Sequence, residues 1–339
     1  MPQNGVPRYS TLYRRDEIEL IINSAKQGES LALMGVAGVG KSNIVNFLRD
    51  IEVNAPHVEQ DVARLHFPIV DATQWQGTFN SLWVLMLDAL NGATASLPTV
   101  SPNPELLSVA EDQRIFRLLQ ARLDYVCQEL EQQVMFVLDD FDRVFEKARL
   151  DELERLSVLR SAGNRGYLSY LVITKQLPHV LGRDKNLEQN CKFYDLFRHN
   201  VYALEPYTRT DALQMLAHLN QKTGNVLSEE QLEHIYHLAG GHAGLLKVVF
   251  FIKQKAPATE LKAIQLAANP DIKQECQRIF SNLHRQEQQV ALRVTQGTHR
   301  PEDSATIDQL ARRGLLVRSA GAIYWFCPLM ANYLKTFEG

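Results

Sequence analysis

The sequence predicts an α/β fold, in which a parallel sheet flanked by helices is followed by a helical lid and a winged-helix domain. Short apolar segments alternate with amphipathic helical segments over residues 1–205. A glycine-rich loop joins the first of these strands to a helix. After Pro206 helical patterns replace strand patterns, and a single hairpin pattern stands near the C-terminus. We therefore expect three domains, at residues 1–205, 206–270 and 271–339.

The first region contains the strand and long helix candidates that define the sheet. Strands are expected at residues 30–34, 64–70, 134–138, 168–174 and 200–204, and helices at residues 43–53, 79–90 and 111–131. The strand segments are short and largely apolar, as in sheets covered on both faces. The helical segments carry apolar residues at spacings of three and four. Residues 91–104 contain Gly92 and three prolines and are expected to form a surface loop.

The remaining two regions are read mainly as helices. Helices at residues 208–222, 228–238 and 243–255 predict a lid, and the second begins with the capping-box pair Ser228 and Gln231. From residue 271 we expect three helices, then strands at 315–318 and 322–326 around Gly321, then a last helix from Pro328. This order is that of a winged helix.

Composition excludes several functional classes. The 339 residues include 36 Lys and Arg against 39 Asp and Glu, a net charge of -3, so no global basic field draws the chain to nucleic acid or to anionic lipid. The N-terminus lacks the apolar segment of a secretory signal, and no apolar run approaches the roughly 20 residues that cross a bilayer. The four cysteines lie far apart, which argues against a zinc site or a disulfide framework and favours buried thiols. We expect a cytoplasmic protein.

Residues 35–42, Gly-Val-Ala-Gly-Val-Gly-Lys-Ser, match the phosphate-binding pattern G-x-x-x-x-G-K-[ST] between a strand and a helix. In such a loop the backbone N–H groups and the N-terminus of the following helix bind phosphate oxygens. Lys41 is expected to contact the β- and γ-phosphates and to take part in catalysis, and Ser42 to ligate Mg²⁺. The candidate nucleotide-binding residues here are Gly35, Val36, Ala37, Gly38, Val39, Gly40, Lys41, Ser42 and Asn43.

The strand at residues 134–138 ends in Asp139 and Asp140, at the edge where ligands gather in open α/β sheets. Asp139 is the candidate second Mg²⁺ residue. Asp140 is the candidate base that polarises the attacking water. Asp142 is expected to cap the following turn. Together with the glycine-rich loop, these residues predict a P-loop NTPase that binds ATP with Mg²⁺.

With these motifs in place, the chain resembles the STAND class of P-loop ATPases, relatives of the AAA+ proteins in signal transduction. Residues 13–20 look like the family's N-terminal box, which packs beside the adenine and implies a nucleotide contact for Arg15; Arg14 stands where glycine is usual. The strand ending in Thr174 resembles the sensor strand, which implies that Thr174 reads the γ-phosphate during catalysis. Lys175 replaces an arginine found in some members.

The lid also carries family-like motifs. Residues 204–208 resemble the L-x-P-L-T entry to the lid, and residues 240–246 resemble the signature Gly-Gly-His-Pro-x-x-Leu with Ala243 in place of the proline. The signature implies a nucleotide contact for His242; the alternative is a glycine C-cap between two helices. Where origin-recognition AAA+ proteins carry a sensor arginine, the nearest equivalent here is Gly244.

The C-terminal region leaves three roles open. A winged helix can bind DNA, and Arg312, Arg313 and Arg318 are placed to meet phosphates. Residues 271–339, however, hold nine Lys and Arg against seven Asp and Glu, a net charge of only +2. In the resembled family this module commonly acts as a nucleotide-dependent latch on the ATPase core. A passive dimer surface is the third role.

These observations favour a Mg-ATP-binding switch that hydrolyses ATP slowly to ADP and phosphate and couples its nucleotide state to assembly, in signalling or defence. Its partners would be further copies or a separate sensor or effector protein. Arg160 and Arg165 are candidates for an arginine supplied to a neighbouring subunit. The alternatives are a DNA-binding AAA+ ATPase of the origin-recognition or transposition type and an interaction module that binds nucleotide without hydrolysing it.

Overall fold

The computed structural model describes residues 13–54, 61–99, 111–160, 162–319 and 321–338. These residues form two compact units. The first comprises the described residues up to Met34 together with those of Ser42–Tyr202. The second combines Gly35–Lys41 with the residues from Ala203 onward, so the glycine-rich loop groups with the C-terminal half of the chain.

The first unit is built on a mostly parallel sheet. Its strands are β1 (Leu31–Met34), β2 (Leu65–His66), β3 (Ile69–Asp71), β4 (Gln133–Asp139), β5 (Leu168–Thr174) and β6 (Val201–Ala203). The strand order is β2-β4-β5-β1-β6, and β3 also pairs with β4. The pairings of β1 with β5, of β4 with β5, and of β2 and β3 with β4 are parallel. This sheet confirms the predicted fold class.

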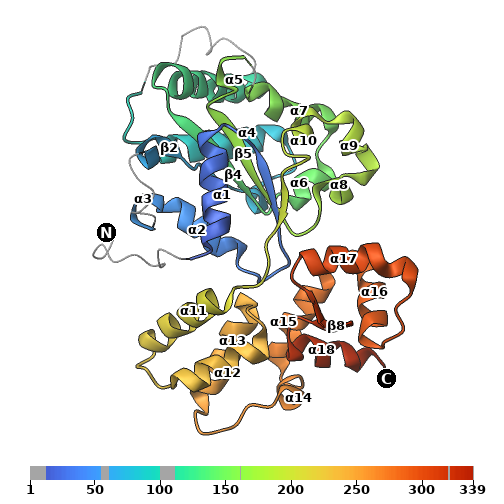
Figure 1. Cartoon of the computed structure of the whole chain (residues 1–339). Helices are drawn as coiled ribbons and strands as arrows, with labels where there is room; N and C mark the ends of the chain where they lie inside the picture. The colour runs from blue at the N-terminus through green and yellow to red at the C-terminus, as the bar shows by residue number, and fades with distance from the viewer. Residues whose placement is uncertain (1–12, 55–60, 100–110, 161, 320, 339) are drawn as a thin grey trace. The chain divides into compact units, whose positions relative to one another are not determined.

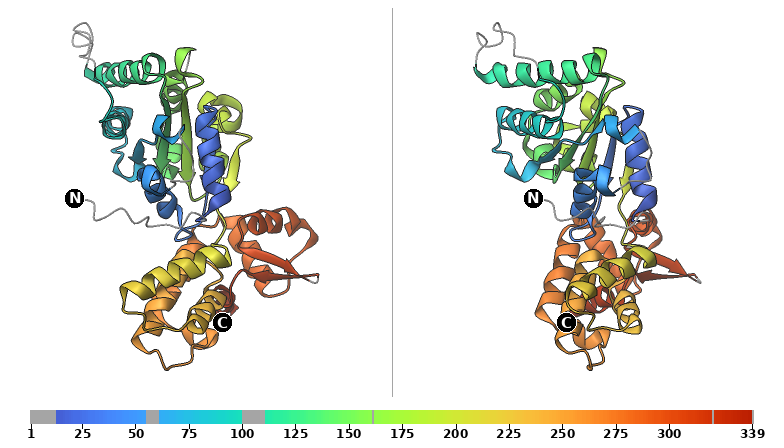
Figure 2. Two further views of the ribbon diagram at one scale, coloured as in Figure 1. Left: turned by 60° about the vertical axis from the view of Figure 1, so that its left-hand side comes forward. Right: turned by 90° about the vertical axis from the view of Figure 1, so that its left-hand side faces the viewer.

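Helices cover both faces of the sheet because its central strands β4 and β5 are largely apolar. Figure 2 shows α1 (Arg15–Lys26) on one side of the strands and α4 (Phe79–Ala93) and α5 (Glu111–Asp124) on the other. Val134, Phe136 and Leu138 of β4 join a core cluster that includes Trp83 of α4. Burying such side chains contributes about 1.5–3 kcal/mol each.

Further helices of the first unit frame the sheet. They are α2 (Lys41–Arg49), α3 (Ile51–Asn54), α6 (Asp142–Lys147), α7 (Leu150–Leu159), α8 (Pro178–Leu181), α9 (Leu187–Asn190) and α10 (Lys192–Asp195). Phe193 of α10 packs against Phe145 of α6 and Tyr170 of β5, which ties this helical layer to the sheet.

The register of the sheet brings its polar strand ends to one edge. Met34, the residue before the glycine-rich loop, is the partner of Thr174, and Asp71 is the partner of Asp139. Because β4 and β5 pair in parallel with Leu138 opposite Val172, Asp139 lies at the same edge. The loop therefore leaves the sheet at the end where the acidic residues stand.

The second unit is helical apart from one hairpin (Figure 1). Its elements are α11 (Arg209–Lys222), α12 (Glu229–Ala239), α13 (Ala243–Lys255), α14 (Ala263–Leu266), α15 (Pro270–Ser281), α16 (Arg285–Thr295), α17 (Ser304–Arg312), β7 (Leu316–Ser319), β8 (Ala322–Trp325) and α18 (Pro328–Lys335). Helix α13 packs on α15, and α12 packs on α18. The expected boundary at residue 270 therefore falls inside one compact unit.

Several local predictions are confirmed in this unit. Ser228 and Gln231 form the capping box of α12 through reciprocal hydrogen bonds. The strands β7 and β8 pair antiparallel around Gly321, as expected for a winged helix.

Three predicted elements of the first unit need correction. The strand expected at 64–70 is two strands, because Pro68 between them has no N–H to donate, although its carbonyl still accepts from Val137 N at 2.9 Å. The helix expected at 43–53 is divided at Asp50 into α2 and α3. The helix expected at 111–131 is α5, which is followed directly by a π-helical turn over Tyr125–Glu129.

The loop expected at 91–104 begins later than predicted. Residues 91–93 are the last turn of α4, and residues 100–104 lie outside the described ranges. The buried Thr94 ends the helix: its backbone N–H and its hydroxyl both donate to Leu90 O, at 2.9 and 2.8 Å. This anchoring explains why Gly92 does not interrupt the helix.

Two global features concern membranes and thiols. Within the described ranges, none of the helices combines the length and apolar character that crossing a bilayer requires. All four cysteines are buried, as predicted.

A buried ion pair holds the C-terminal module together and yields a stability prediction. Arg313 donates to both carboxylate oxygens of Glu287, at 2.8 and 3.0 Å, with 3% and 6% of the two side chains exposed. Glu287→Ala would leave an uncompensated buried charge, so we expect a loss of about 3–5 kcal/mol in the free energy of unfolding. Denaturant unfolding measures this loss.

The control is the exposed pair of Arg318 and Asp308 in the same module. Arg318→Ala should change the free energy of unfolding by less than about 1 kcal/mol, because exposed pairs are screened by solvent. Equal effects of the two substitutions would contradict the role given to the Glu287 pair.

Candidate nucleotide-binding site

The glycine-rich loop has a backbone conformation that requires glycine. Gly38 and Gly40 have φ angles of 77° and 117°, in the region that favours residues without a Cβ. A Cβ built on Gly38 would lie 2.2 Å from Glu275 Oε1, so space as well as conformation excludes a side chain there. The two glycines allow the loop to turn back tightly between β1 and α2.

Lys41 and the start of α2 complete a cationic end to this loop. The buried Lys41 ammonium donates to Gly35 O at 2.6 Å and to Val36 O at 3.1 Å. Ser42 is exposed and Asn43 half-buried in the first turn of α2, a turn that holds no acidic residue to offset the helix dipole. The loop, Lys41 and Ser42 therefore fit a bound nucleotide phosphate with its Mg²⁺.

His242 contacts the loop through its imidazole. Its Nδ1 accepts from Leu245 N at 3.3 Å as the N-cap of α13, so Nε2 carries the proton and donates to Ala37 O at 2.9 Å. Gly244 N also donates to the loop, at Gly38 O, at 2.9 Å. Both ring nitrogens of His242 are engaged, so the predicted nucleotide contact would require one of these bonds to open.

The glycine C-cap, the alternative reading of the lid signature, is confirmed, whereas the nucleotide contact of His242 stays a prediction. Gly240 ends α12 as a left-handed C-cap with φ 57°, and a Cβ there would lie 2.3 Å from Phe326 O. Ala243, in the proline's place, is the first residue of α13, where proline is well tolerated. The glycine C-cap therefore positions His242 against the loop.

The acidic strand end is organised by Lys175. The Lys175 ammonium lies 2.8 Å from Asp140 Oδ1, and Asp140 itself adopts a left-handed φ of 50° after β4. Burial lowers the pKa of Lys175, but its hydrogen bond to Asp140 and the charges of Asp140, Asp142 and Asp139 raise it above the usual value overall. Asp139 Oδ1 accepts from Asp140 N at 3.0 Å. Lys175 is thus a charged partner of the candidate water-polarising residue.

Two other predicted residues make local bonds. Thr174 is fully buried and its hydroxyl donates to Gln176 O at 2.7 Å, so donation to a γ-phosphate would require this bond to break. Asp142 accepts from Lys175 N at 2.9 Å and so holds the backbone after β5. The sequence suggested instead that Asp142 caps the turn that follows it. The catalytic role of Thr174 stays a prediction.

The N-terminal box forms the start of α1. Arg14 has a left-handed φ of 40° at the position where the resembled family has glycine, which explains the usual preference there. Its buried guanidinium pairs with Glu17 at 2.7 Å. The Arg15 side chain is exposed and pairs with Glu19 at 2.7 Å, so its nucleotide contact stays a prediction.

The arginines proposed for DNA or for a neighbouring subunit differ in their surroundings. Arg313 was one of three arginines that could meet DNA phosphates, but its side chain is buried against Glu287 and is not exposed for such a contact. Arg312 is exposed. Arg160 donates to Leu168 O and Gly28 O at 2.9 and 2.6 Å and so supports the first unit internally. Arg165 is exposed and is the more accessible of the two candidates for action in trans.

Sequence reasoning missed three residues that lie beside the predicted site residues. Asp71, in register with Asp139, accepts from Thr73 and Gln74, and the Thr73 hydrogen bond is the main reason that its pKa is lowered. A polar residue after the second apolar strand was the available signal. Asn282 and Glu275 contact the loop from more than 230 residues away, and no local pattern marks them.

Comparison with known proteins places the fold. No family model and no curated protein matches the sequence. Among solved structures, the Walker-type ATPase PABY2304 of Pyrococcus abyssi has a TM-score of 0.59 at 14% identity, covering 98% of this chain and 99% of that one. The ORC2 protein of Aeropyrum pernix, solved as ADPNP–ADP complexes, has a TM-score of 0.51 at 13% identity, covering 99% and 97%. The chain therefore has the fold of these two proteins, a mostly parallel sheet flanked by helices with a helical C-terminal region.

The buried His242 predicts a pH-dependent stability. Burial lowers the pKa of His242 to about 4; its bond to Ala37 O acts in the opposite direction, and the charges of Lys41 and Arg278 lower the pKa further. The unfolded chain takes up this proton near pH 6.5 and the folded chain only near pH 4. Stability is therefore intact above pH 6.5 and falls, by about 3 kcal/mol, as the pH drops to 4.

Urea unfolding of the wild type and of His242→Asn across this pH range measures the effect. Asparagine is also a good N-cap, and the variant should lose this part of the pH dependence. His237→Asn, at an exposed histidine of α12, is the control and should keep it. A pH dependence shared by all three proteins would contradict a neutral buried His242.

Proposed function

We propose that the chain is an ATPase of AAA+ architecture that binds Mg-ATP at residues 35–42. The observation that carries the proposal is the loop itself, in which two glycines at positive φ and the Lys41 ammonium form a phosphate cradle before the N-terminus of α2. In this proposal Mg²⁺ would be held by Ser42 and, through its water shell, by Asp139, and would neutralise charge on the phosphates.

Hydrolysis in this proposal is slow. Asp140 is the candidate base, but its carboxylate is paired with Lys175 at 2.8 Å, and aspartate is one methylene shorter than glutamate. The carboxylate oxygen that contacts Lys175 would have to leave this partner before it could accept a proton from the attacking water. ATP is converted to ADP and phosphate at a low basal rate, which suits a switch that resets slowly.

For the output of the proposed ATPase, the comparisons favour the DNA-binding alternative over a STAND switch. The ORC2 likeness supports a DNA-binding AAA+ ATPase as the second candidate function. Two arginines of the winged helix are engaged internally, Arg313 with Glu287 and Arg293 with Asp303. A salt-dependent titration of the full chain with duplex DNA separates a DNA-bound ATPase from a switch that assembles with protein partners.

The first functional prediction concerns Lys41. Lys41→Ala should abolish Mg-ATP binding, because the cradle loses its positive charge. In the wild type, ATP at 100 times its dissociation constant should stabilise by about 2.7 kcal/mol and raise the melting temperature by about 5–10 °C. Thermal melts with and without Mg-ATP measure this, with the exposed Lys222→Ala as the charge-matched control. An unaltered shift in Lys41→Ala would remove the assignment.

The second functional prediction separates the two aspartates. Asp139→Asn should weaken Mg²⁺-dependent binding of ATP, because Asp139 is proposed to orient the metal's water shell. Asp140→Asn should keep ATP bound and reduce turnover by about 10²–10⁴-fold, the range for loss of a general base. Equilibrium binding and phosphate release, measured on the same preparations, distinguish the two effects. Undiminished turnover in Asp140→Asn would show that another group polarises the water.

A further inference from the structure

One face of α15 is packed on the glycine-rich loop, residues 35–42. Glu275, Arg278 and Asn282 are spaced by three and four residues, so a helix places them on the same side, with Asn282 as its C-cap. The loop residues Gly35–Lys41 belong to the same compact unit as this helix. The nucleotide site proposed above involves none of the three side chains.

Asn282 accepts a hydrogen bond from a backbone N–H of the loop. Its Oδ1 accepts from Ala37 N at 2.7 Å. The backbone N–H groups of a phosphate-binding loop are the donors on which phosphate oxygens depend. Each N–H has a single hydrogen, so phosphate can accept from Ala37 only after the Asn282 carboxamide has moved.

Glu275 places a carboxylate against the same loop. A Cβ built on Gly38 or on Gly244 would lie 2.2 or 1.9 Å from Glu275 Oε1, so both glycines leave room for this oxygen. Glu275 is only 6% exposed, and Oε1 has no hydrogen-bond donor among the residues that the structure describes. A buried carboxylate oxygen without a donor is unfavourable, and beside a phosphate it would also be repelled.

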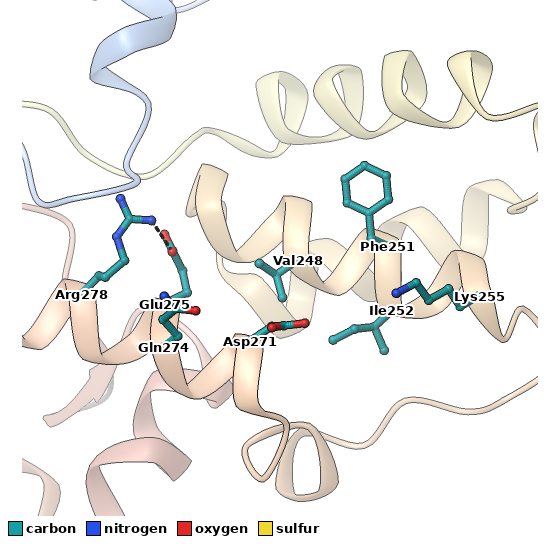
Figure 3. Close-up of a pocket in the computed structure, with 8 residues that line it drawn as sticks. All are labelled: Val248, Phe251, Ile252, Lys255, Asp271, Gln274, Glu275 and Arg278. Carbon is teal, nitrogen blue, oxygen red and sulfur yellow. Dashed lines mark hydrogen bonds and ion pairs between the residues drawn. The ribbon is translucent and has the colours of Figure 1, made fainter.

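Arg278 offsets this charge. Its Nη1 lies 2.7 Å from Glu275 Oε2, as the dashed line in Figure 3 shows. The two side chains stand at one end of a groove of about 280 Å³ between α13 and α15, whose lining also includes Asp271 and Lys255. Half of the Arg278 side chain is open to solvent, so it can turn away from Glu275 without leaving the surface.

We propose that Glu275 and Asn282 are an internal mimic of phosphate that sets the nucleotide affinity of the loop. Their oxygens occupy the acceptor side of the loop until nucleotide displaces them, and Arg278 determines how strongly Glu275 opposes an incoming phosphate. Entry of nucleotide is thereby coupled to release of α15 from the loop. This inference rests on the proposed nucleotide binding and adds the residues that regulate it.

The test is the dissociation constant of a fluorescent ATP analogue with Mg²⁺, measured on the full chain. Glu275→Gln keeps the shape and removes the charge, so affinity should rise by at least about threefold. Asn282→Ala frees Ala37 N–H and should raise affinity by about two- to tenfold, the equivalent of one hydrogen bond. Asp271→Asn makes the same charge change at an exposed residue of α15 and should leave affinity unchanged.

Arg278→Ala should change the affinity for the ATP analogue in the opposite direction. Without its counter-charge, Glu275 should repel phosphate more strongly and affinity should fall, whereas the double variant Arg278→Ala with Glu275→Gln should recover it. A merely structural role for these residues would make every substitution weaken binding. Affinity that is unchanged or weakened in both Glu275→Gln and Asn282→Ala would overturn the proposal.

A nucleotide-free measurement keeps this proposal separate from the proposed function. Amide hydrogen exchange at Ala37 should be faster in Asn282→Ala than in the wild type, because the N–H loses its acceptor. Unchanged exchange at Ala37 would show that the Asn282 contact does not form in solution. Failure of the wild type and of all variants to bind the analogue would instead overturn the proposed nucleotide site.

Discussion

The rest of the candidate site depends on the backbone polar groups of residues 35–41. Within this loop Val39 N donates to Val36 O at 3.4 Å, and buried N–H and C=O groups that are not paired in this way need partners elsewhere. The partners come from Lys41, from His242 and Gly244 at the start of α13, and from Asn282 at the end of α15. A ligand on the loop and the packing of these two helices therefore draw on the same atoms, which makes them thermodynamically linked.

The sheet could be predicted because its central strands β1, β4 and β5 are buried and form largely apolar segments of the sequence. The errors lie where one residue alters a regular pattern: Pro68 divides a strand, and Asp50 divides a helix. At residues 91–93, Gly92 suggested a loop, but the helix continues to Thr94, whose hydroxyl accepts from the Arg122 guanidinium of α5 at 2.9 Å. Such contacts involve residues far apart in the chain and leave no local signature.

The candidate site divides in the same way. The loop, Asp139 and Asp140 are contiguous motifs whose spacing follows from the chemistry of phosphate and Mg²⁺, so the sequence alone is enough to predict them. Glu275 and Asn282 reach the loop only through the packing of α15, and their positions in the sequence give no hint of it. Arg313 is the converse case: its place near a winged-helix hairpin made it a candidate for phosphate contact, but the side chain is buried with Glu287.

The backbone at Asp140 has a consequence for how this chain can evolve. Its left-handed φ of 50° is tolerated by aspartate and asparagine far better than by longer side chains, because the short polar group can bond locally. Aspartate and glutamate codons differ by one base, so a longer, better-placed carboxylate is a single mutation away. That mutation would carry the strain of the turn after β4, and a faster enzyme would therefore need a second change that rebuilds the turn. The main-chain conformation at Asp140 therefore disfavours the substitution that would raise the proposed rate of ATP hydrolysis.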